Sequence, residues 1–140
     1  LLVTPTDNDT VVVSLSSGVV HDKNGIGNAP AQFTITFDSL LPHIALSPDP
    51  LPATTASPFI VYANFTVAVV NFSASNVSAQ NGTVSGLTEN APNNGTNFAF
   101  TVTPTQAGTV TVSIPGGVTQ STAKNKNVPS NVIYTNFVPQ

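Results

Sequence analysis

Apolar and polar residues alternate along most of this chain with the two-residue period of β-strands. The clearest run covers residues 59–69, where every second side chain is apolar: Phe59, Val61, Ala63, Phe65, Val67 and Val69 share one face. Shorter runs of the same kind cover residues 98–103 and 109–114. Clusters of Pro, Gly and Asn separate these runs. Short alternating strands divided by turn residues predict an all-β protein, folded as an antiparallel β-sandwich.

The second part of the chain, residues 44–140, contains the strands of one complete domain. The pattern predicts seven strands, near 43–47, 58–68, 76–79, 82–86, 96–103, 108–114 and 130–137. Seven strands in a segment of this length predict an immunoglobulin-like sandwich. The expected core is the apolar face of the longest runs: Phe59, Val61, Phe65, Phe98, Phe100, Val110, Val112 and Ile114.

A four-residue phrase, VTPT, occurs at residues 3–6 and again at 102–105. At the same offset of 99, 13 of the first 38 residues are identical to their later counterparts, including Gly18, Asn28, Pro30 and Thr36. A fixed period of this kind indicates repeated domains. We therefore predict a tandem repeat with an incomplete first copy: residues 1–38 form the last three strands of a preceding domain, near 1–5, 10–15 and 32–37, and residues 39–43 form a linker.

The incomplete copy carries an apolar face that three strands cannot bury by themselves, because a sandwich needs a second sheet. Its members are Leu1, Val3, Val11, Val13, Leu15, Phe33, Ile35 and Phe37. We expect strands from outside residues 1–140 to cover this face. They come from the preceding stretch of a longer chain or from a neighbouring protomer. Both routes predict head-to-tail self-assembly into a filament or a tandem array.

Two long phrases resemble a known family. Residues 57–87 read SPFIVYANFTVAVVNFSASNVSAQNGTVSGL, and residues 98–118 read FAFTVTPTQAGTVTVSIPGGV. They are similar to the bacterial Ig-like repeats of large surface proteins and adhesins. The resemblance covers residues 44–137 and, as a half copy, residues 1–38. It implies extracellular or cell-surface tandem domains that act as stalks, spacers or adhesive modules. Where the family often carries acidic residues, this chain has Val67 and Asn76, so we expect no calcium between its domains.

The composition excludes several classes of partner. Charged residues make up 6% of the chain, with three Lys or Arg in total and a net charge of −3. No basic face for nucleic acid or for an anionic membrane surface can be built from three cations. No apolar run reaches the length of a spanning helix, so we expect no membrane insertion. Cysteine is absent, which excludes disulfides and thiolate chemistry.

Catalytic and metal-binding patterns are weak. The two histidines, His21 and His43, have no serine and aspartate at a spacing that indicates a triad, and Glu89 is the only glutamate. We therefore predict no enzyme activity, no catalytic residues and no cofactor. Asp7, Asp9 and Asp22 could meet at one end of the half copy and offer oxygen ligands to Ca²⁺. They are more simply turn residues with side-chain caps, so no metal ligand is predicted.

Six asparagines lie in Asn-x-Ser/Thr sequons: Asn8, Asn64, Asn71, Asn76, Asn81 and Asn94. Such an asparagine must be exposed to carry a glycan. The sequence thus predicts N-linked glycans as partners of an almost uncharged surface. Together these features predict an extracellular structural protein, a subunit of a filament, stalk or surface layer. The alternative is an adhesin module that binds carbohydrate or protein at a tip of the sandwich.

Overall fold

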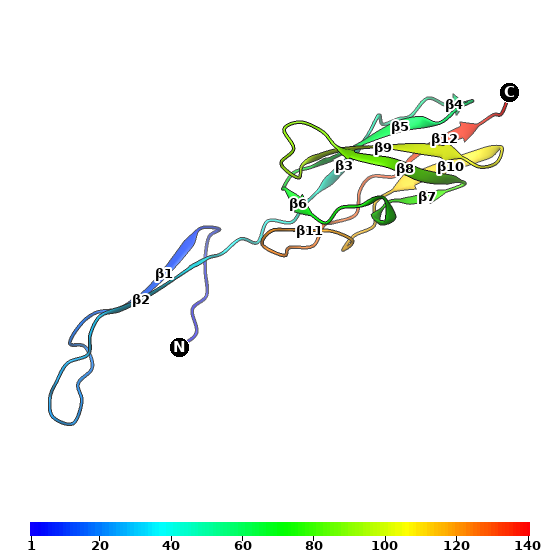
Figure 1. Cartoon of the computed structure of the whole chain (residues 1–140). Helices are drawn as coiled ribbons and strands as arrows, with labels where there is room; N and C mark the ends of the chain where they lie inside the picture. The colour runs from blue at the N-terminus through cyan, green and yellow to red at the C-terminus, as the bar shows by residue number, and fades with distance from the viewer. The chain divides into compact units, whose positions relative to one another are not determined.

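The structure, a computed structural model, describes all 140 residues and divides them into two compact units, Leu1–Leu40 (unit 1) and Leu41–Gln140 (unit 2). Both units are built from β-strands (Figure 1). The only helical segment is one 3₁₀ turn, η1 (Ala74–Asn76). No helix has the length and apolar character that crossing a membrane requires. The protein is therefore all-β, as its alternation predicted.

Unit 1 is a β-hairpin with a long connecting loop. Strand β1 (Thr10–Leu15) pairs antiparallel with β2 (Ala31–Thr36), and Val13 lies opposite Phe33. The strands predicted at 10–15 and 32–37 are thus present. The strand predicted near 1–5 is wrong, because residues 1–6 have no regular structure. The corresponding residues of unit 2, 100–104, belong to a strand that is hydrogen-bonded to a neighbouring strand on each side. Unit 1 contains no equivalent of either neighbour, so residues 1–6 have no strand to pair with.

Unit 2 is a β-sandwich of two four-stranded sheets. The first sheet has the order β3 (Ile44–Ser47), β5 (Phe59–Phe65), β9 (Asn97–Pro104) and β8 (Gly82–Glu89). The second has the order β4 (Thr54–Thr55), β12 (Ile133–Phe137), β10 (Gly108–Ser113) and β7 (Ser78–Gln80). All neighbours are antiparallel except β4 and β12. A separate pair joins β6 (Val69–Val70) to β11 (Gln120–Ser121).

The inward side chains of both sheets form one core. All eight predicted core residues lie in it or, in the case of Phe59, pack against it. Phe100 is 1% exposed, and Val110 and Val112 are fully buried. Phe65, Phe72 and Phe98 close one part of the core with edge-to-face ring contacts, whose centroids are 5.0 to 5.7 Å apart. The alternation pattern therefore identified the buried face correctly.

The boundary between the units falls within the predicted linker 39–43. Pro42 is buried in unit 2, and its carbonyl oxygen accepts a hydrogen bond from the Val128 amide at 3.0 Å. Unit 2 thus begins before its first strand, at Leu41.

Candidate functional site

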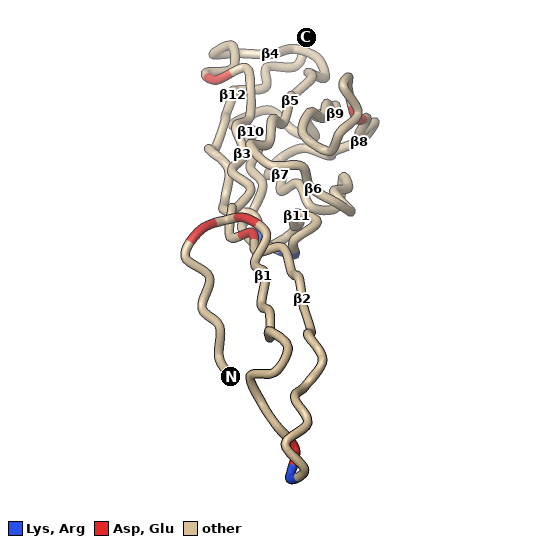
Figure 2. Tube along the Cα trace, turned by 90° about the vertical axis from the view of Figure 1, so that its left-hand side faces the viewer, with Lys and Arg blue, Asp and Glu red and all other residues tan.

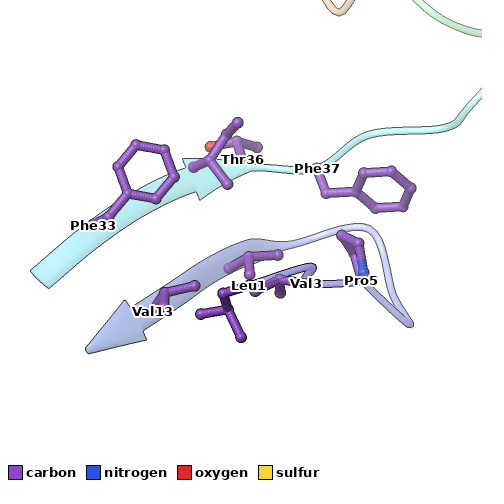
Figure 3. A pocket seen from close by; sticks show the side chains of 9 residues that line it. Leu1, Val3, Pro5, Val13, Phe33, Thr36 and Phe37 are labelled. Atoms are coloured by element: carbon purple, nitrogen blue, oxygen red, sulfur yellow. The ribbon is translucent and has the colours of Figure 1, made fainter. Parts of the chain in front are cut away.

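The most unusual feature of unit 1 is an apolar face that the unit covers only in part. Phe33 is 62% exposed and Ile35 is 53% exposed, although both lie in the middle of a strand. Figure 3 shows how side chains from both strands and from the segment before β1 surround one hollow of about 420 Å³. It is lined by Leu1, Val3, Pro5, Val11, Val13, Phe33, Ile35, Thr36 and Phe37. We call these residues the open face.

The strand register relates the open face to the core of unit 2. In unit 1 the paired positions of β1 and β2 include Val11 with Ile35 and Val13 with Phe33. In unit 2 the pairs are Val110 with Thr135 and Val112 with Ile133. β1 therefore matches β10 at an offset of 99, and β2 matches β12 at an offset of 100. The four counterparts in unit 2 are 0 to 3% exposed: Val110, Val112, Ile133 and Thr135.

The change of offset corrects one detail of the sequence alignment. The identity between Thr36 and Thr135 is fortuitous, because the register places Ile35 at the position of Thr135. Ile133 lies four positions after Pro129, whereas its counterpart Phe33 lies three positions after Pro30, so unit 2 has one residue more in this stretch. The apolar residues of β2 therefore stand where unit 2 has its core, which the ungapped alignment did not show.

The loops that connect these strands have the same hydrogen bonds in both units. In unit 2, Asn127 accepts from the Thr119 amide at 3.0 Å and donates to the carbonyls of Pro115 and Val128, both at 2.9 Å. In unit 1, Asn28 makes the three equivalent bonds, at distances from 2.7 to 3.0 Å, with Val20, Ser16 and Ala29. Gly18 and Gly117 both have positive φ, 72° and 78°, a conformation that suits glycine.

The asparagine at the centre of each loop has no predicted role from the sequence. A signal was present, because Asn-x-Pro occurs at residues 28–30 and 127–129 at the repeat offset. The motif alone did not predict the hydrogen bonds of the asparagine, because its partners are backbone groups up to twelve residues away in the sequence.

The two edges of the hairpin have no neighbour in unit 1. β1 and β2 pair only with each other and form a two-stranded sheet. In unit 2 the corresponding edges are both occupied, since β7 pairs with β10 and β4 pairs with β12. Unit 1 thus presents an uncovered face and two open edges, which is the arrangement that extends a sheet or completes a sandwich when another strand arrives.

The six predicted glycosylation sites differ in how their side chains are used. Asn64 and Asn71 are exposed, and their amide groups make no hydrogen bond within the chain. Asn81 is half-buried and holds a turn: its amide nitrogen donates to the carbonyls of Gln106, at 2.8 Å, and Thr109, at 3.3 Å. Because a glycan replaces one of the two hydrogens on that nitrogen, modification of Asn81 would remove at least one of these bonds.

The other three sequons use their amide oxygens. Asn8 accepts from the amide and hydroxyl of Ser39, Asn76 accepts from Ser73, and Asn94 accepts from the Thr96 hydroxyl. These bonds leave each amide nitrogen available, so the geometry is compatible with attachment at all three. The prediction of glycans at these positions remains a prediction.

The acidic residues considered for calcium do not come together. Asp9 precedes β1, whereas Asp22 lies in the loop at the opposite end of the hairpin, and Figure 2 shows acidic residues at both ends. The Asp22 carboxylate instead accepts from the amides of Asn24 and Ile26, at 2.8 and 2.9 Å. No three His, Asp or Glu side chains form a group that could hold a metal ion.

Two of the residues considered for catalysis, His21 and Glu89, make contacts within loops. His21 and His43 are both exposed, and His21 forms a single β-bridge with Gly27 in the long loop. Glu89, the only glutamate, accepts a hydrogen bond from the Gly95 amide and so closes the loop between β8 and β9. The structure does not bring these side chains into one site.

The chain matches no protein-family model, and no curated protein or solved structure shows significant similarity to it.

Proposed function

We propose that this chain is a non-enzymatic structural protein of the cell surface or extracellular space, built from immunoglobulin-like repeats. In this proposal it is a module of a filament, stalk or surface layer, and neighbouring modules join head to tail. The observation that carries the proposal is the open face of unit 1. Its β2 side chains Phe33 and Ile35 are exposed and its β1 side chains Val11 and Val13 are half-buried, while the four counterparts in unit 2 are buried.

The strand order supports an immunoglobulin-like topology. The constant-type immunoglobulin sandwich places its strands in the orders A-B-E-D and C-F-G. Unit 2 has the orders β3-β5-β9-β8 and β7-β10-β12, with the short strand β4 added beside β12. When the two-residue strands are left out, the letters A to G fall in chain order on β3, β5, β7, β8, β9, β10 and β12. With these letters, the two sheets of unit 2 have the orders A-B-E-D and C-F-G.

The two loops support the tandem repeat. A long loop between the last two strands can take many conformations, and its hydrogen bonds depend on its particular sequence. Asn28 and Asn127 make the same three bonds with backbone groups at matching positions. On this interpretation β1 and β2 are the last two strands of a preceding domain.

The energetics favour covering the open face. Complete burial of a large aliphatic or aromatic side chain contributes roughly 1.5–3 kcal/mol. Because Phe33 and Ile35 are each more than half exposed, covering these two residues alone would contribute on the order of 3 kcal/mol. A contact between the end of one module and the start of the next is heterologous, and such contacts propagate into linear or helical assemblies when they do not close into a ring.

Glycans fit the same proposal. The surface has very few charges, and Figure 2 shows long stretches of the chain that carry none. Asn64 and Asn71 are the best candidates, because their amides are exposed and unused. Attached sugars would keep this surface solvated where charged side chains do not.

Electron microscopy of the protein isolated from its native source tests the proposal. The expected result is linear material with a regular repeat along its axis. The substitution Val13→Asp, on the open face, should abolish it, whereas Val12→Asp, which places the same charge on the other face of β1, should not. Discrete particles of uniform size would contradict the proposal and favour the binding module instead.

A further inference from the structure

We propose that the open face of unit 1 is completed by a polypeptide segment with the sequence pattern of residues 41–99, the first half of another copy of the same sandwich. This inference rests on the proposed repeat architecture and names the partner of the open face. In unit 2, residues 41–99 supply the first sheet apart from residues 100–104 of β9, together with β4 and β7 of the second sheet. These strands cover the counterparts of the open face.

The open edges define how the segment pairs. In unit 2, β7 lies antiparallel to β10 with Ala79 opposite Val112. The same position in unit 1 is Val13, so the free edge of β1 takes an antiparallel strand centred on that residue. β4 lies parallel to β12 with Thr55 opposite Phe137, and the counterpart of Phe137 in unit 1 is Phe37, directly after the last residue of β2. Each edge therefore accepts one short strand of fixed direction.

A folded unit 2 from another molecule is not the partner. Each copy of residues 1–140 contains one first half, residues 41–99, and two second halves, residues 1–40 and 100–140. The first half is already used within unit 2, where it shares a core with β10 and β12. If it were donated to a neighbour, the second half of its own unit would be left uncovered. The segment that completes unit 1 must therefore be an additional first half, from outside residues 1–140.

The chemistry of β2 specifies this segment further. In unit 2, Thr135 donates to the Pro52 carbonyl at 2.7 Å. The register places Ile35 at the position of Thr135, and its side chain cannot donate this bond. The part of the proposed partner that corresponds to Pro52 therefore meets an apolar side chain on β2.

An extended protein tests the inference. Residues 41–99 are placed directly ahead of Leu1, so that Leu1 takes the position of Phe100 and the remaining chain is unchanged. Hydrogen–deuterium exchange is followed by mass spectrometry in the extended and original proteins. We expect the amides of β1 and β2 to exchange at least roughly 100-fold more slowly in the extended protein. Val13→Asp should remove this protection, while Val12→Asp should retain it.

A second variant separates an imperfect fit from a wrong partner. The extended protein with Ile35→Thr restores the hydroxyl group that bonds the Pro52 carbonyl in unit 2. If the hairpin exchanges as fast in both extended proteins as in the original chain, the inference is overturned. It is also overturned if the original chain already protects β1 and β2 in a concentration-dependent dimer, because the partner is then a second copy of the hairpin. Neither exchange result depends on whether native material forms filaments, so this inference and the proposed function can fail separately.

Discussion

Asn127 provides the sharpest test of the energetics, because the chain contains its own control. The Asn127 side chain is 4% exposed and makes three hydrogen bonds with the backbone of its loop. A hydrogen bond contributes about 1 kcal/mol net, and a buried group left without a partner costs about 1–3 kcal/mol. Thr119, whose amide would lose its acceptor, is 3% exposed. We therefore expect Asn127→Ala to lower the free energy of unfolding of unit 2 by about 3–4 kcal/mol.

Urea unfolding followed by tyrosine fluorescence measures this change. Tyr62 and Tyr134 are the only tyrosines, both lie in unit 2, and tryptophan is absent, so the signal reports on unit 2 alone. The control is Asn28→Ala, which removes the same three bonds from unit 1 and should change the measured value by less than about 0.5 kcal/mol. A loss below about 1 kcal/mol for Asn127→Ala, or equal losses for both variants, would refute the reasoning.

Three further predictions concern unit 2. Phe100→Ala should lower its free energy of unfolding by about 3–5 kcal/mol, measured in the same way, whereas Ile60→Ala, at a side chain that is 54% exposed, should cost well under half as much. Asn81→Ala should cost about 2 kcal/mol, because the side chain bonds the turn before β10 and the residue has φ of 56°; an unchanged urea midpoint would contradict this role. In glycopeptide mass spectrometry of native material, Asn64 and Asn71 should carry sugars and Asn81 should not; modified Asn81 would show that the turn tolerates loss of a hydrogen bond from its amide nitrogen.

The sequence predicted the strands that have their own alternating pattern. Residues 59–65 and 97–104 bury every second side chain against the core, so their period was visible without the structure. β8 was expected to end at Gly86, yet it continues to Glu89. The register shifts between Ser85 and Thr88, and Gly86 has φ of 63°, so a bulge inside the strand resembled its end in the sequence.

Other features depend on partners distant in the sequence. β4, β6 and β11 have only two residues each and carry no period of their own. β4 is a strand because it forms hydrogen bonds with β12, and β6 and β11 are strands because they form hydrogen bonds with each other. The role of Asn127 depends in the same way on Pro115 and Thr119. The open face itself was predicted from the repeat, but its correct alignment needed the register of β1 with β2.

A map of native assembled material at side-chain resolution, obtained by electron cryomicroscopy, would show whether the open face is an interface. The quantity to compare is the exposed fraction of Phe33 and Ile35, which is 62% and 53% in the single chain. We expect both to fall to the level of their counterparts, Ile133 and Thr135, at 1% and 3%, beneath strands from outside residues 1–140. An assembly in which both side chains remain in solvent would contradict it.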